Sequence, residues 1–129
     1  MIGVQVAGGD PLTQAYLLGK ESFSLPDAPD SLAEGIIATE SYASAKALKA
    51  INESKGMMIS VTETEIQEAH EQIQETEDLT PEFTSSSVYA AVKKIKVTLG
   101  EIIVCINTGS AVKETVTLDK LSLSLQAPL

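Results

Sequence analysis

The sequence predicts an α/β fold of three layers, in which helices cover both faces of a mainly parallel sheet. Three short apolar runs, at residues 2–6, 57–61 and 101–106, are bounded by turn-forming residues and are typical of buried strands. Segments with helix-capping residues, or with apolar residues at helical spacing, lie between these runs. A chain of 129 residues suits one domain of this kind.

The first strand–helix unit is predicted at the start of the chain. Residues 2–6 (IGVQV) form a short buried strand. Asp10 and Pro11 then begin a helix that continues to about Leu18, because a capping carboxylate and a proline at the first helical position both favour a helix start. Residues 20–34 are rich in Pro, Ser and Asp and are predicted to form a surface loop.

The middle of the chain predicts an extended segment, a helix and a central strand. Residues 35–39 (GIIAT) are weakly strand-like or merely extended. A helix is expected to begin at Ser41 or Tyr42 and to end near Ser54, since its apolar residues recur at spacings near 3.6. Residues 57–61 (MMISV) form a continuous apolar run that suits a central parallel strand.

Two helices are predicted after this strand. Thr62 and Glu65 form a capping box, in which each side chain bonds the backbone N–H of the other residue. The acidic helix that they begin is expected to end near Glu77. A further helix is predicted to start with Thr84 or Ser85 as its capping residue.

The last third of the chain changes in character. Residues 101–106 (EIIVCI) form the clearest buried strand of the sequence, and they lead into a polar strand end at 107–110 (NTGS). Residues 115–125 alternate between apolar and polar, which predicts a half-exposed edge strand or a tail that needs a partner. We therefore expect one α/β domain over residues 1–114 and a tail or edge strand over 115–129.

Composition and charge restrict the class of partner. The chain has 18 acidic residues against nine basic ones, all lysine, and a net charge of −9. Such a surface repels phosphate backbones, so we expect no nucleic acid and no membrane as the main partner. Apolar segments fall short of the roughly 20 residues that a membrane span needs. A single cysteine, Cys105, forms no internal disulfide, which favours a reducing, cytoplasmic location.

Few residues have the pattern of a catalytic or metal-binding centre. The only histidine, His70, lies on the acidic helix and is expected to be solvated, and the chain has no His/Cys cluster for zinc. Cys105 is expected to be a packed core thiol. Gly8 and Gly9 precede a helix as in phosphate-binding loops, but Asp10 puts a negative charge at the anion position, which argues against phosphate binding there.

Two groups of hydroxyl side chains are better candidates. The strand end at 107–110 can hydrogen-bond a flat heteroaromatic ligand, or it is simply a turn. The run at 84–87 (TSSS) begins a helix, where it either caps the helix or contributes to a site. The residues alone leave both alternatives open.

A set of ordered segments resembles the C-terminal part of threonine synthase and related β-family (fold type II) pyridoxal-phosphate enzymes. The resemblance covers about residues 2–114. Its matching segments, with the family's version in brackets, are 36–39 IIAT (TIAT), 46–48 KAL (KAL), 61–66 VTETEI (VSDEEI), 82–85 EFTS (EPAS) and 104–114 VCINTGSAVKE (VCVLTGHGLKD).

The chain also departs from the family pattern. About five residues are missing between Thr39 and Lys46, Phe83 replaces a proline, and Ser110 and Ala111 replace a His-Gly pair. The family's catalytic half would lie before residue 1. That half supplies the Schiff-base lysine, the substrate loop and the Gly-rich loop for the cofactor phosphate. None of the nine lysines of this chain has a matching context.

The resemblance implies pyridoxal phosphate as the cofactor and three residues that contact it. Thr108 matches the family residue that contacts the pyridine nitrogen, and Ser85 and Glu82 match positions on the cofactor side of the site. A hydroxyl at the pyridine nitrogen leaves that nitrogen less protonated than a carboxylate would. The resemblance implies no catalytic residue and no metal ligand within this chain.

Three interpretations of function follow. The chain is part of a threonine synthase-like enzyme that is inactive alone, or a non-catalytic, homo-oligomeric binding module derived from that fold, or an unrelated α/β protein. Without the preceding half, the fold would expose surfaces that are normally covered. We therefore expect either a missing N-terminal catalytic half or homo-oligomerisation, with residues 115–125 covering an open strand edge.

Overall fold

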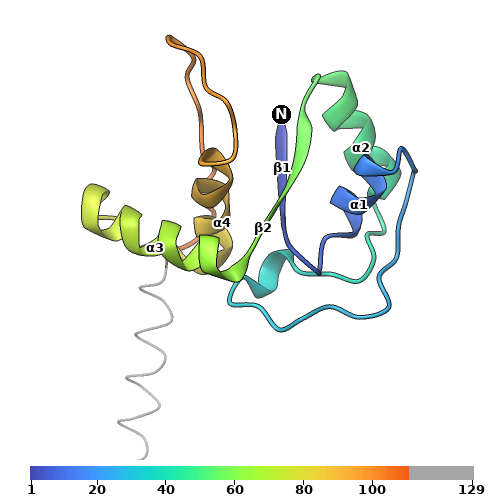
Figure 1. The fold of residues 1–129 in the computed structure, drawn as a ribbon, viewed down its shortest axis with the longest axis horizontal. Coiled ribbons are helices and arrows are strands. Elements are labelled where there is room, and N and C mark those ends of the chain that lie inside the picture. Colours follow the sequence, from blue (N-terminus) through green and yellow to red (C-terminus); the bar gives the residue numbers. More distant parts are fainter. Residues whose placement is uncertain (111–129) are drawn as a thin grey trace, which may run out of the picture.

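A two-stranded parallel sheet lies at the centre of the computed structural model, which describes residues 1–110 (Figure 1). The strands β1 and β2 pair from Ile2 opposite Met57 to Val6 opposite Val61. In chain order the elements are β1 (Ile2–Val6), α1 (Pro11–Leu17), the 3₁₀ helix η1 (Glu34–Ile36), α2 (Ser44–Glu53), β2 (Met57–Val61), α3 (Glu63–Glu77) and α4 (Phe83–Val92). None of these helices is long and apolar enough to cross a membrane.

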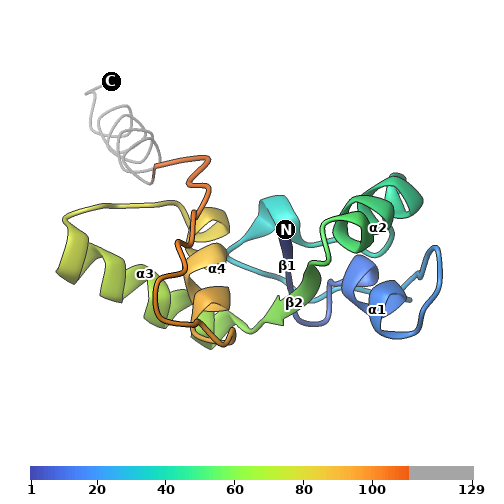
Figure 2. The ribbon, with the colours of Figure 1, turned by 90° about the horizontal axis from the view of Figure 1, so that it is seen from above.

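Helices cover both faces of the sheet, as predicted. Figure 2 shows α1 and α2 on one side of the strands and α3 and α4 on the other. The core on the α4 side contains Val6, Ala33, Val61, Ile66, Ala69, Ala90 and Ala91. The core on the other side contains Ala15, Leu48, Ile51 and Met58. The three-layer α/β architecture predicted from the sequence is therefore confirmed.

The pairing of β1 with β2 leaves one edge of β1 open. Met57 donates its N–H to the carbonyl of Met1, and Ala7 donates its N–H to the carbonyl of Val61. In a parallel ladder these bonds recur at every second residue of a strand, so the odd-numbered residues of β1 face β2. The backbone groups of Ile2 and Val4 therefore point to the opposite edge, where no described strand pairs with them.

The start of α1 is at the predicted place, but Asp10 does not cap it. The Asp10 side chain makes no capping hydrogen bond to the helix backbone. Its carboxylate instead accepts a hydrogen bond from the Gln14 amide (3.1 Å) and another from the Ser60 hydroxyl. Asp10 is only 3% exposed, so these bonds to α1 and β2 satisfy a buried charge that would otherwise be costly.

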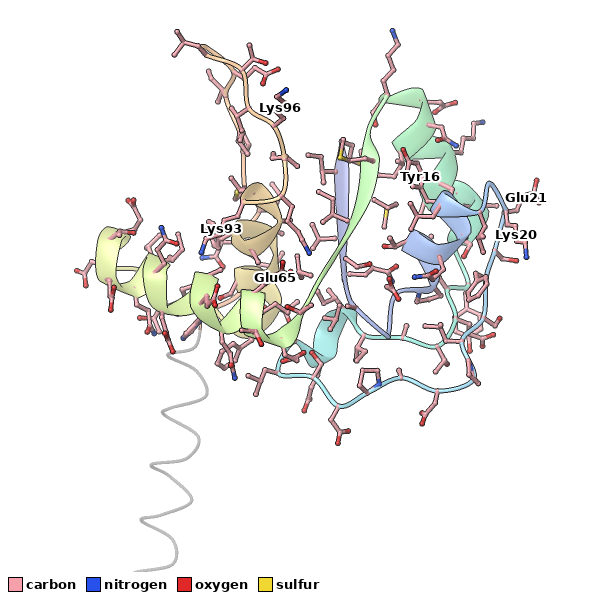
Figure 3. The ribbon with its side chains drawn as sticks, in the orientation of Figure 1. Tyr16, Lys20, Glu21, Glu65, Lys93 and Lys96 are labelled. Atoms are coloured by element: carbon pink, nitrogen blue, oxygen red, sulfur yellow. The ribbon has the colours of Figure 1, made fainter. Side chains whose placement is uncertain are left out.

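The capping box of α3 is confirmed. The Glu65 N–H donates to the Thr62 hydroxyl (3.3 Å), and the Thr62 N–H donates to the Glu65 carboxylate (2.8 Å). The Lys94 ammonium donates to the same carboxylate and to the Ser60 carbonyl, both at 2.8 Å. These contacts tie β2, α3 and the chain after α4 together, and Figure 3 shows Glu65 where α3 passes α4.

Several predicted boundaries need correction. Residues 35–39 form no strand, because Glu34–Ile36 makes a 3₁₀ turn followed by irregular chain. The predicted start of the middle helix at Ser41 or Tyr42 is early, since α2 begins at Ser44. The predicted capping of the last helix by Thr84 or Ser85 is wrong, because α4 already begins at Phe83 with Glu82 before it.

The prediction of a buried strand at 101–106 is also wrong for this chain. These residues are irregular, and Ile102 and Val104 are 90% and 76% exposed. The physical reason is that the described residues provide no neighbouring strand for them. Cys105 is half-buried rather than a packed core thiol, and burial raises the pKa of its thiol above the usual range. The predicted edge strand or tail at 115–129 lies outside the described residues.

Candidate functional site

The structure brings together the three residues that the sequence singled out. Glu82 lies directly before α4, Ser85 lies in its first turn, and Thr108 comes from the segment that returns along the helix. The hydroxyl oxygens of Ser85 and Thr108 are 3.3 Å apart, and the Thr108 hydroxyl donates to Glu82 Oε1 over 3.4 Å. A contiguous polar cluster thus forms from residues that lie far apart in the chain.

Ser85 is the centre of this cluster. Its hydroxyl oxygen accepts the backbone N–H groups of Thr108 (3.1 Å) and Gly109 (3.2 Å), and Ser85 is only 2% exposed. The Glu82 N–H donates to the Gly109 carbonyl (3.3 Å), and Ser110 forms an antiparallel bridge with Pro81. The polar strand end is therefore held against the start of α4 by side-chain and backbone bonds.

Gly109 has a steric role in this arrangement. A Cβ atom at this position would overlap with the carboxylate of Glu82. The absence of a side chain at Gly109 lets that carboxylate approach the Thr108 hydroxyl. The strand end was predicted at residues 107–110. Thr108 and Gly109 are the two of these residues that join the cluster at the N-terminus of α4.

A cavity of about 540 Å³ lies beside the cluster. Ser85 and Thr108 contribute hydroxyl groups to it, and most of the remaining wall is aliphatic. Most of its apolar residues come from β1, α4 and the 102–106 segment, and they include Ile2, Val4, Val88, Val92, Ile103 and Ile106. A largely apolar cavity with a few polar groups is the usual form of a site for a flat organic ligand.

The other serine hydroxyl groups of the 84–87 run do not join the cluster. Ser86 donates to the Glu82 carbonyl (3.1 Å), and Ser87 donates to the Thr84 carbonyl (2.6 Å). Both residues are buried within the helix layer. Their hydroxyl groups therefore satisfy nearby backbone carbonyls at the start of their own helix.

His70 is not the solvated helix residue that the sequence predicted. Its ring stacks on Phe83 with the centroids 4.5 Å apart, and its Nδ1 lies 3.1 Å from the Ser86 hydroxyl. The pair joins α3 to the first turn of α4, which carries Ser85. No local pattern in the sequence indicates this contact, because it depends on how the two helices pack.

Gly8 and Gly9 each lie close to a side chain of the segment after α1. A Cβ at Gly9 would overlap with the Ile37 side chain, and one at Gly8 would meet Pro29 at 3.2 Å. Within residues 1–110, no cluster of three or more His, Cys, Asp or Glu side chains could hold a metal ion.

Comparison with known proteins assigns the class. Residues 1–109 match the family described as pyridoxal-phosphate dependent enzyme, and the chain belongs to this family. It is 32% identical over 122 residues to a threonine synthase from Methanosarcina acetivorans. That alignment covers 91% of this chain but 30% of the relative, so the chain spans about a third of the relative's length.

Solved structures show the same fold. The processed form of threonine deaminase isoform 2 from Solanum lycopersicum superposes with a TM-score of 0.64 and 22% identity, covering 93% of this chain and 34% of that one. A threonine deaminase from T.th. gives a TM-score of 0.59 at 20% identity, with 72% and 33% covered. The resemblance to fold type II pyridoxal-phosphate enzymes that the sequence indicated is confirmed.

Proposed function

We propose that this chain is the C-terminal part of a threonine synthase-like enzyme and forms the side of the site that receives the pyridine ring of pyridoxal phosphate. The observation that carries the proposal is the cluster of Glu82, Ser85 and Thr108 at the polar side of an apolar cavity. The family match and the threonine synthase relative support the choice of cofactor and of enzyme class.

The donor set fits the cofactor. The Thr108 hydroxyl lies 3.3 Å from the Ser85 hydroxyl and donates to Glu82 over a long 3.4 Å, so it can turn its proton toward a ring nitrogen. Ser85 fixes the backbone of Thr108 and thereby the position of that hydroxyl. The aliphatic wall of the cavity excludes water from the faces of a planar ring. When bound, the cofactor supplies the electron sink for amino-acid chemistry.

The chain is proposed to be inactive alone, because its candidate site offers no amine to hold the cofactor covalently. No lysine lines the cavity among the described residues. The Lys94 ammonium is held by Glu65 and the Ser60 carbonyl, and Figure 3 shows Lys93 and Lys96 at and beyond the end of α4. In this proposal, the lysine that holds the cofactor covalently belongs to the catalytic half of the enzyme, which lies outside this chain. A single cysteine supports a cytoplasmic location for the assembly.

A titration of the full chain with pyridoxal phosphate, followed by borohydride reduction and intact-mass measurement, tests this proposal. We expect saturable binding without a covalent adduct. Thr108→Val should weaken binding about tenfold, since one hydrogen bond of about 1.4 kcal/mol corresponds to that factor. Thr39→Val, at an exposed threonine outside the cavity, is the matched control.

Two results would contradict the proposal. A reduced adduct on one specific lysine would mean that the chain carries its own covalent site and is an independent enzyme. Absence of binding at any cofactor concentration would favour a module that keeps the fold without the chemistry.

A second candidate function is a homo-oligomeric binding module derived from the same fold. The exposed apolar side chains of Ile102, Val104 and Ile106, together with the open edge of β1, favour an association of some kind. Light scattering of the purified chain over a range of concentrations separates the alternatives. A stable dimer that does not bind pyridoxal phosphate would support the module.

A further inference from the structure

We propose that His70 is a positioning residue for the candidate site. From α3, its side chain holds the first turn of α4 and, through Glu82, the strand end that carries Thr108. His70 does not line the cavity, so it acts on the site through other residues. Its effect on the cofactor rests on the proposed function, whereas the contacts that carry the proposal join residues of this chain alone.

The start of α4 has no side-chain cap of its own. Glu82 precedes the helix, but its side chain makes no capping hydrogen bond, and the first turn contains no acidic residue. Phe83, the first residue of α4, replaces the proline of the family segment, and a proline would restrict the backbone at this position. The first turn therefore depends on contacts with other parts of the chain.

His70 makes two contacts with this turn from the neighbouring helix α3 (Figure 1). Its ring stacks on Phe83 with the centroids 4.5 Å apart and an angle of 28° between the planes. Its Nδ1 atom lies 3.1 Å from the hydroxyl oxygen of Ser86, and Ser86 is fully buried. The half-buried ring thus contacts two residues of the same helical turn and restricts the position of that turn.

The Ser86 hydroxyl determines the direction of the hydrogen bonds. It has a single proton, which it donates to the Glu82 carbonyl over 3.1 Å. Its oxygen is then an acceptor for His70, so Nδ1 of the ring carries a proton and Nε2 of the neutral ring does not. Two successive hydrogen bonds, which we call the His70 relay, therefore join His70 to Ser86 and Ser86 to Glu82.

Glu82 connects the His70 relay to the strand end. Its N–H donates to the Gly109 carbonyl over 3.3 Å, and its carboxylate accepts from the Thr108 hydroxyl over 3.4 Å. Both distances are long for a hydrogen bond, so a small displacement of Glu82 would break these bonds. We expect the His70 relay to prevent that displacement and thus to keep the Thr108 hydroxyl at the cavity.

The position of the ring proton is the first test, and it uses the native chain. His70 is the only histidine of the sequence, so its ring nitrogen signals in the NMR spectrum of the ¹⁵N-labelled full chain are assigned without ambiguity. At a pH where the ring is neutral, we expect the proton on Nδ1. A proton on Nε2 would overturn the inference, whether or not any variant folds.

Amide hydrogen exchange in two variants is the second test. His70→Leu removes both the ring stack and the donor. The amides of Glu82, Thr108 and Gly109 should then exchange about tenfold faster, as for the loss of one hydrogen bond. His70→Asn keeps an N–H group near the position of Nδ1, and its rates should stay within about threefold of the native ones.

Gln67→Leu is the matched control, because it places the same side chain at an exposed position of the same helix. It should leave the three amides unchanged, and the amides of Gly3 and Gln5 in the sheet should be unaffected in every variant. Equal acceleration of Gly3 and Gln5, no change at the three amides, or no rescue by His70→Asn would each overturn the inference. The expected exchange pattern in a chain that does not bind pyridoxal phosphate would contradict only the proposed function.

Discussion

At the scale of single residues, the candidate site depends on one buried hydroxyl. Ser85 accepts two backbone N–H groups from the returning segment and contacts the Thr108 hydroxyl. It therefore positions Thr108 in addition to lining the cavity. The site is polar where these bonds converge and apolar elsewhere, and this contrast sets the orientation of a ligand that has one polar edge.

Ser85→Ala should destabilise the chain by about 1–3 kcal/mol, because it removes the shared acceptor of two part-buried backbone N–H groups. Urea unfolding followed by circular dichroism measures this change. The control is Ser87→Ala, at an equally buried serine whose hydroxyl bonds only a carbonyl of its own helix. Equal losses for the two variants would mean that Ser85 has no special role in holding Thr108.

At the scale of elements, the junction of β2, α3 and the chain after α4 depends on Glu65. Burial alone would raise the pKa of this carboxyl. Hydrogen bonds from Lys94 and from the Thr62 backbone, with the charge of Lys94, outweigh burial and lower the pKa below its ordinary value of 4.5. The folded chain therefore stabilises the ionised carboxylate of Glu65 relative to the unfolded chain.

Glu65→Gln should lower the free energy of unfolding at neutral pH. A carboxyl with a lowered pKa in the folded state stabilises the fold above its ordinary pKa, and this contribution disappears as the pH falls through the lowered value. The difference between the two proteins should therefore shrink below about pH 4.5. Urea unfolding between pH 7 and pH 3 measures it, with Glu68→Gln on the exposed face as control. A difference that is independent of pH would exclude the charge as its cause.

For the molecule as a whole, no described strand pairs with the outer edge of β1 or with the outer edge of β2. Within residues 1–110, two strands, four α-helices, one 3₁₀ helix and an exposed apolar segment form a layered fold in which the central layer is narrow. Sheets of this kind usually have more strands, with helices on both faces. The chain covers about a third of the length of the relatives that share its fold.

The open edge predicts alternating amide protection along β1 in the isolated chain. The N–H groups of Gly3 and Gln5 bond to β2 and should exchange slowly, whereas that of Val4 points to the open edge and should exchange fast. Hydrogen exchange followed by NMR resolves the individual amides. Uniform protection of these three residues would show that the edge is already covered, by another part of the chain or by a second copy.

Features that depend on near neighbours in the chain could be predicted from the amino-acid sequence. The strands at residues 2–6 and 57–61 follow from short apolar runs, and the capping box of Thr62 and Glu65 follows from two residues three positions apart. Thr108, Ser85 and Glu82 were found through a family resemblance that depends on the order of motifs. Capping hydrogen bonds and side-chain periodicity involve residues only a few positions apart. The predictions of the strands and of the capping box therefore needed no knowledge of the packing.

Contacts between groups that lie far apart in the chain could not be predicted, because they depend on how the helices and strands pack. It bonds Asp10 to Ser60 instead of to the helix backbone, and it packs His70 on Phe83 instead of leaving it in water. It also leaves residues 101–106 largely exposed, although their sequence is that of a buried strand. An apolar run tends to be buried, but it forms a strand only where a neighbouring strand completes its backbone hydrogen bonds.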